Sequence, residues 1–238
     1  MNTTVLGSVL AWWTSDVPVL PSPQAMQWAL QASWSVVLAW RGATLVARWS
    51  RTRAVPLGVA AVLAASAWLP GQAATSYWLG LAFQAPSISA VLLCGLVLRA
   101  RWMGSRTEKA AGVGMSAGGP AGVVAVFGVV LGWALLLDTF ALLPVPLYAW
   151  GFSPAAPVVV ALLGLAPWLL RGATRTGGWA GAVGGAAVLL FVLLRLPSGN
   201  LWDAVLDPWL WLVLHIHVGL KLHSCYKKSS CLRTLYKR

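Results

Sequence analysis

The chain has 238 residues, of which 59% are hydrophobic and only 9% are Asp, Glu, Lys or Arg. Soluble domains carry about 25% charged residues, so this composition argues against a water-exposed surface of the usual kind. The formal net charge of +12 does not indicate nucleic-acid binding, because the basic residues stand in clusters between apolar segments. The three cysteines predict no disulfide framework and no metal site. The composition predicts an all-α integral membrane protein.

Apolar segments that are long enough, or nearly long enough, to cross a bilayer occur seven times along the chain. A spanning helix needs about 20 apolar residues. Helices are expected because unpaired strand edges are not tolerated in lipid. The expected helices are 24–47, 55–71, 76–98, 121–143, 155–170, 178–195 and 204–221.

The basic residues predict how these helices are oriented. Basic clusters follow the first, third, fifth and seventh segments, and Arg195 is the only one of the 17 Lys and Arg residues expected on the other side. Basic loops stay in the cytoplasm, so we expect the N-terminus outside and the C-terminus inside. The predicted architecture has about seven transmembrane helices, a first helix followed by three helical hairpins.

This orientation divides the chain into three parts. Residues 1–23 are expected to lie in the interface at the outer face, anchored by Trp12 and Trp13. Residues 24–221 form the predicted seven-helix transmembrane domain, and residues 222–238 form a basic cytoplasmic tail. The Arg-, Ala- and Gly-rich body is typical of a high-GC bacterium, which predicts a multi-pass protein of the bacterial inner membrane.

Four ionisable residues are expected near the outer boundary of the membrane, and such residues are candidates for function because burying them in lipid is costly. Asp138 lies about 17 residues into its segment, roughly 25 Å from the segment's start. Asp203 and Asp207 are one helical turn apart. Arg195 ends the preceding segment at the same level, and we expect it to pair with one of these carboxylates. The cluster is either a ligand or ion site or a set of solvated interfacial residues.

Two glutamines are candidates for lining a cavity inside the helix bundle. Gln31 is in the first segment, and Gln84 stands just before Pro86 in the third. Proline interrupts the hydrogen-bond ladder of a helix, and polar groups beside such a kink can line a cavity. Hydrogen bonds between helices are the more common use of such residues.

Two histidines of the last segment, His215 and His217, are candidates for binding a pigment or haem. They are about 200° apart around a helix, so one chain cannot supply both axial ligands of a haem from this segment. Either histidine could still be a ligand to a group shared with a partner. The sequence identifies no cofactor.

The absence of a catalytic motif favours a non-enzymatic role. We expect an integral membrane subunit that stabilises or assembles a larger inner-membrane complex, with the lipid bilayer and other membrane subunits as its partners. Glycine pairs such as Gly128 with Gly132, and Gly181 with Gly185, either pack helices within the bundle or contact another subunit. The alternatives are a small solute transporter or channel, a lipid-handling enzyme using the outer carboxylates, and a pigment- or haem-associated subunit.

Overall fold

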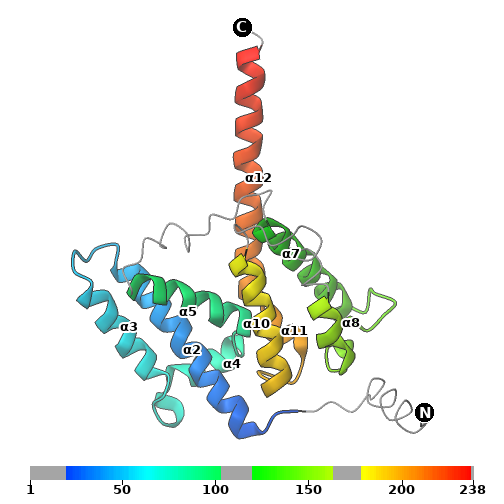
Figure 1. The fold of residues 1–238 in the computed structure, drawn as a ribbon. Helices are drawn as coiled ribbons and strands as arrows, with labels where there is room; N and C mark the ends of the chain where they lie inside the picture. Colours follow the sequence, from blue (N-terminus) through cyan, green and yellow to red (C-terminus); the bar gives the residue numbers. More distant parts are fainter. Residues whose placement is uncertain (1–19, 103–119, 163–177, 237–238) are drawn as a thin grey trace.

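The structure is a computed structural model that describes residues 20–102, 120–162 and 178–236. These residues form helices and no β-strand, which confirms the all-helical fold. Figure 1 shows α2 to α5 grouped on one side and α7 to α12 on the other, with the C-terminal part of α12 projecting beyond both groups. The expected interfacial segment 1–23 lies almost entirely outside the described residues.

Four predicted helices begin within a residue of the predicted position: α2 (Pro23–Val46), α3 (Ala54–Ser66), α4 (Thr75–Phe83) and the helix predicted from 155. Helices α7 (Pro120–Thr139) and α10 (Gly178–Leu194) are described from the residues that follow the two gaps. The start of α2 shows why: Pro23 is its first residue, and the side chain of Ser22 accepts a hydrogen bond from the Ala25 N–H at 3.2 Å. The predicted helix 155–170 is helical from 155 to 162, and the rest of it lies outside the described residues.

Two predicted helices are interrupted, and the prediction of a continuous helix was wrong for both. Segment 76–98 is divided into α4 (Thr75–Phe83) and α5 (Ile88–Trp102), because Gln84 leaves the helical conformation with φ 61°. Segment 204–221 is divided into α11 (Leu201–Val205) and α12 (Pro208–Tyr236), with Leu206 extended between them. Helix α12 also continues through most of the predicted tail. The short helices η1 (Gly71–Ala73) and α8 (Leu147–Trp150) lie in two of the turns.

The helices pack in two groups that meet at α10. Helix α2 packs against α3, α4 and α5, whereas α12 packs against α7, and α10 contacts α5, α7 and α11. Ala39, Ala43 and Ala60 form the core between α2 and α3. Phe191 of α10 and Leu201 of α11 are fully buried in a second cluster, which also contacts Ile88 at the start of α5. The start of α5 therefore lies close to α10 and α11.

Alanine is the most frequent buried apolar residue, and many large apolar residues are exposed on the exterior. More than half of the buried apolar residues described are alanines. The exposed residues of four helices include Leu81 and Phe83 of α4, Val126, Phe127 and Val130 of α7, Val192, Leu193 and Leu194 of α10, and Leu212, Val213 and Ile216 of α12. This distribution is the reverse of the one that a water-exposed surface favours.

Among the described residues, none of the helices combines the length and the apolarity needed to span a membrane. The seven-span arrangement is therefore not established by the fold.

Candidate functional site

The two helix interruptions meet at a buried carboxylate. Asp207, which is 8% exposed, accepts hydrogen bonds at one oxygen, Oδ2, from the backbone N–H and the hydroxyl of Ser87, at 2.8 and 2.6 Å. Its other oxygen, Oδ1, accepts from the N–H of Leu210 at 2.7 Å. Ser87 is fully buried. We name this contact the Asp207–Ser87 crossing.

At the crossing, one carboxylate accepts hydrogen bonds from backbone N–H groups at the starts of two helices. Ser87 precedes α5 and accepts a hydrogen bond from Ala90 N–H at 3.1 Å, while Asp207 precedes α12 and accepts one from Leu210 N–H. Each residue therefore occupies the N-cap position of its helix. The N-terminus of a helix carries a partial positive charge, so an anionic side chain between two such ends is favoured electrostatically. The arrangement can hold a negative charge in a buried position.

The two candidate glutamines are not brought together. The backbone carbonyl of Gln84 accepts a hydrogen bond from the Trp34 indole at 3.0 Å, but the Gln84 side chain is exposed. The carbonyl of Gln31 accepts from the Ser35 hydroxyl at 2.8 Å, and its side chain is half-buried. Trp34 thus stabilises the interruption after α4, and neither glutamine side chain contributes to the crossing.

The other two carboxylates meet at Tyr148 in the turn after α7. Asp203 Oδ2 accepts hydrogen bonds from the Tyr148 hydroxyl at 2.9 Å and from the Ser198 hydroxyl. Asp138 Oδ2 accepts from the Tyr148 N–H at 2.7 Å. The structure therefore brings Asp138 and Asp203 to one tyrosine, whereas Asp207 lies at the crossing with Ser87. The prediction grouped all three.

A buried asparagine fixes this turn against the loop after α10. Asn200 donates from Nδ2 to the Tyr148 carbonyl at 2.9 Å and accepts from Trp202 N–H at 2.9 Å, and Trp202 donates from its indole to the Leu147 carbonyl at 2.8 Å. A Cβ at Gly151 would overlap Asn200 and lie 2.5 Å from Trp202 Cδ1, so the close approach of the two loops requires glycine there.

Burial raises the pKa of the Tyr148 phenol, and the neighbouring Asp203 charge raises it further. Both effects disfavour the phenolate. The hydroxyl therefore remains a hydrogen-bond donor to Asp203. The Asp203 carboxylate thus has a neutral hydrogen-bond partner in the Tyr148 hydroxyl.

Arg195 does not form the expected ion pair. Its guanidinium lies 5.3 Å from the centroid of the Phe191 ring, and its backbone adopts φ 57°. The carboxylates that the structure describes accept their hydrogen bonds from Tyr148, Ser198, Ser87 and Leu210 instead. Because the chain turns in the left-handed conformation at Arg195, the side chain follows its own helix and stays over Phe191.

Both ring nitrogens of His215 are engaged in hydrogen bonds. Its Nδ1 lies 2.9 Å from the Trp211 carbonyl, and its Nε2 lies 3.0 Å from the Trp133 indole nitrogen. A carbonyl only accepts and an indole N–H only donates, so Nδ1 carries the proton and Nε2 accepts. Ligation of a metal by His215 would require one of these bonds to break. His217 is half-buried on the same helix, and no group of three metal-binding side chains occurs among the described residues.

The sequence reasoning missed four residues of these contacts: Ser87, Tyr148, Ser198 and Asn200. Two signals could have identified the crossing. Ser87 directly after Pro86, and Asp207 directly before Pro208, are both patterns of a helix N-terminus. No protein-family model, curated protein or solved structure matches the chain.

Proposed function

We propose that the chain is a non-enzymatic helical subunit of the bacterial inner membrane that stabilises or assembles a larger complex. The single observation that carries this proposal is the distribution of side-chain size, with alanine and serine prominent among the buried residues and many large apolar side chains exposed. Helices in lipid associate through close packing of small residues, because lipid removes the hydrophobic driving force between them. Large apolar residues then face the acyl chains.

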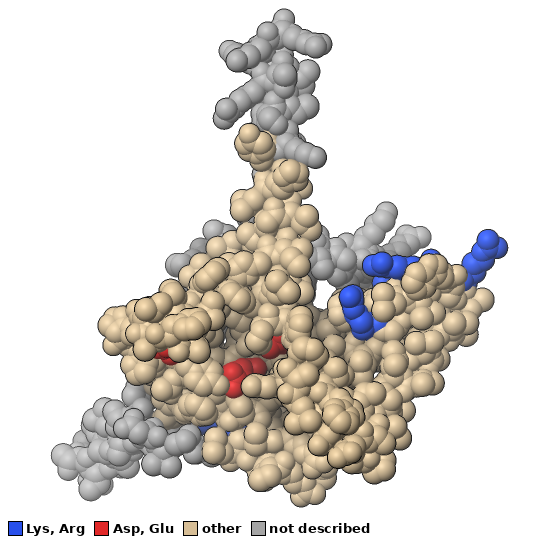
Figure 2. Space-filling model, turned by 180° about the vertical axis from the view of Figure 1, so that it is seen from behind, with Lys and Arg blue, Asp and Glu red and all other residues tan. Residues whose placement is uncertain are grey.

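The charge distribution supports the same placement. On the face drawn in Figure 2, most of the Lys and Arg side chains gather at one end, and the acidic side chains lie near the middle. The described arginines after α2 are Arg48, Arg51 and Arg53, and those at the end of α5 are Arg99 and Arg101. Basic residues gathered at one end are the signature of the cytoplasmic side.

Unpartnered glycines support the assembly role. A Cβ at Gly128 would lie 2.6 Å from Leu214 Cδ1, and one at Gly132 would overlap the Trp211 indole, so this pair packs α7 against α12. On α10, a Cβ at Gly184 or Gly185 would meet no atom of the described residues within 4 Å. Within the described part of the chain, this glycine face is open to close approach by a helix of another subunit.

Cysteine labelling in intact cells tests the membrane placement. Single cysteines at Gln72 and Leu142, both exposed in turns expected at the outer face, should react with a membrane-impermeant maleimide. A cysteine at Thr52, which is exposed after α2, should react only after permeabilisation. The background replaces Cys94, Cys225 and Cys231 by serine. Labelling of all three positions in intact cells, or of none, would contradict the proposed orientation.

Native electrophoresis of gently solubilised membranes tests the assembly role. Gly185→Leu is expected to move the chain from a large complex to the size of the lone chain, because leucine blocks close helix approach. The chain should stay folded, since glycine is a poor helix former and a Cβ added at this position meets no described atom within 4 Å. Gly58→Leu is the matched control, because Gly58 also meets nothing within 4 Å but lies on α3. If the wild type, Gly185→Leu and Gly58→Leu all run in a complex of equal size, the glycine face of α10 is not an assembly surface.

The Asp207–Ser87 crossing favours one alternative, a small solute transporter or channel. In transporters, interrupted helices place their N-termini and freed backbone groups at the substrate site. At the crossing, the carboxylate already accepts three hydrogen bonds from its own chain. Flux across liposomes that contain only this chain, lost in Asp207→Asn while the helical content is kept, would favour transport over assembly.

A further inference from the structure

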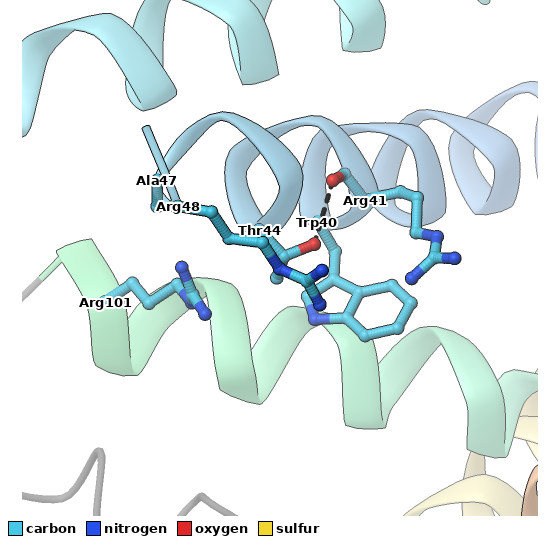
Figure 3. A pocket seen from close by; sticks show the side chains of 6 residues that line it. All are labelled: Trp40, Arg41, Thr44, Ala47, Arg48 and Arg101. Atoms are coloured by element: carbon cyan, nitrogen blue, oxygen red, sulfur yellow. Dashed lines mark hydrogen bonds between the residues drawn. The ribbon is translucent and has the colours of Figure 1, made fainter. Parts of the chain in front are cut away.

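A basic pocket lies where the C-terminal ends of α2 and α5 meet. It has a volume of about 370 Å³ and is lined by Trp40, Arg41, Thr44, Ala47, Arg48 and Arg101. Figure 3 shows Arg101 of α5 and Arg48 of α2 on the side toward which the nitrogen edge of the Trp40 indole is turned. Arg41 lies against Trp40, with its guanidinium carbon 5.9 Å from the ring centroid. We name this site the arginine pocket.

Two buried donors of the arginine pocket have no acceptor. Trp40 Nε1 and Arg101 Nε are buried and lack a hydrogen-bond partner. Within the part of the chain that the structure describes, they are the two buried side-chain polar atoms of this kind. Buried donors are nearly always paired, since an unpaired one loses its hydrogen bonds to water and gains none. The indoles of Trp34 and Trp202 follow this rule and donate to carbonyls. The two donors of the pocket therefore indicate a missing acceptor.

The positive charge of the arginine pocket has no carboxylate close by among the described residues. The three described acids, Asp138, Asp203 and Asp207, accept hydrogen bonds at Tyr148 and Ser87, away from this end. The negative C-terminal ends of α2 and α5 account for arginines at this place. They do not account for donors that are buried without an acceptor. An anion with several oxygens in the pocket would offset the charge of the three arginines.

We propose that the arginine pocket binds the phosphate of an anionic phospholipid. Guanidinium groups present their N–H donors in a planar fork that matches phosphate oxygens, and three arginines line this pocket. Basic pockets between helices on the cytoplasmic side are suited to anionic headgroups. The choice of a lipid as the source of this phosphate group rests on the membrane placement proposed above. Inorganic phosphate has the same binding chemistry, so the experiment separates the two sources.

The test measures lipid binding to the full chain in neutral detergent. Short-chain phosphatidylglycerol is titrated into the purified protein, and bound lipid is counted by native mass spectrometry, with phosphatidylcholine and inorganic phosphate as parallel arms. The Arg48→Gln/Arg101→Gln variant should weaken phosphatidylglycerol binding by about tenfold or more. Arg51→Gln removes an exposed arginine of the same end outside the pocket and should change binding by less than about twofold. Circular dichroism checks that each variant is folded.

A conservative variant keeps the test decisive if the double variant does not fold. Arg101→Lys retains the charge but removes Nε and the planar fork, so binding should still fall. Inorganic phosphate that binds as tightly as phosphatidylglycerol, and is lost in the same variants, would support a phosphate site and overturn the lipid as its ligand. Equal lipid binding by the wild type and the pocket variants would overturn the proposal, while cysteine labelling would still decide the membrane placement independently.

Discussion

Asp207→Ala is expected to cost roughly 3–9 kcal/mol of folding free energy, because each buried donor left without an acceptor costs about 1–3 kcal/mol. Three donors lose their acceptor at once: the N–H and hydroxyl of Ser87 and the N–H of Leu210. Since whole domains are stable by only about 5–15 kcal/mol, this loss removes a large part of the stability. Unfolding in detergent, followed by circular dichroism, measures the loss.

Two companion variants separate the hydrogen bonds of the crossing from the mere loss of a charge. Asp207→Asn keeps one oxygen as an acceptor and a good N-cap, so its loss should be smaller than that of alanine. In a double-mutant cycle, Ser87→Ala and Asp207→Ala should be non-additive by about 0.5–3 kcal/mol, as for residues in direct contact. An Asp207→Ala protein within about 0.5 kcal/mol of the wild type would contradict the crossing.

Gly132→Ala is expected to be the most damaging single methyl addition among the glycines of α7. Its Cβ would overlap the rigid indole of Trp211, which also donates a hydrogen bond to the Val129 carbonyl at 3.1 Å. The Trp211 ring is held by Trp133, with ring centroids 5.4 Å apart, so it cannot easily move aside. Overpacking of this kind costs about 1–3 kcal/mol, measured again by unfolding in detergent.

Two other glycines are the controls for this variant. Gly128→Ala should cost less, because the Cβ would meet only the flexible end of Leu214. Gly58→Ala should stabilise α3 by up to about 1 kcal/mol, since the position is open and alanine is the better helix former. Equal effects of all three substitutions would show that α7 and α12 do not pack through this face.

Helix positions that are set by local signals could be predicted from the sequence. Helix α2 follows the prediction 24–47 within a residue, and α10 ends within a residue of its predicted end at 195, because the apolar runs there are bounded by Pro23 and Pro197. The interruptions were missed for the opposite reason. Averaging apolarity over about 20 residues conceals a single polar N-cap such as Ser87 or Asp207 inside an apolar run.

The partners at the site depend on tertiary packing, which no spacing in the sequence encodes. Asp207 lies one turn from Asp203 along the chain, and on a continuous helix the two would share a face. The helix is interrupted at Leu206, so the two carboxylates point to different partners. Asp203 accepts a hydrogen bond from Tyr148, and Asp207 accepts one from Ser87. Arg195 lies eight residues before Asp203 in the sequence, yet its left-handed backbone directs it to Phe191.

The span between the two halves of the crossing has a consequence for the order of synthesis. The hydrogen bond from Ser87 to Asp207 joins residues that are 120 apart in the sequence. At about 5–20 residues per second, the ribosome needs roughly 6 to 24 s to reach Asp207 after it has made Ser87. During that time, the N–H and hydroxyl of Ser87 lack the Asp207 carboxylate to which they donate in the folded protein. The packing of α2 to α5 is therefore completed only after α12 has been synthesised. A chain that stops before Asp207 leaves the hydrogen-bond donors of Ser87 without this acceptor.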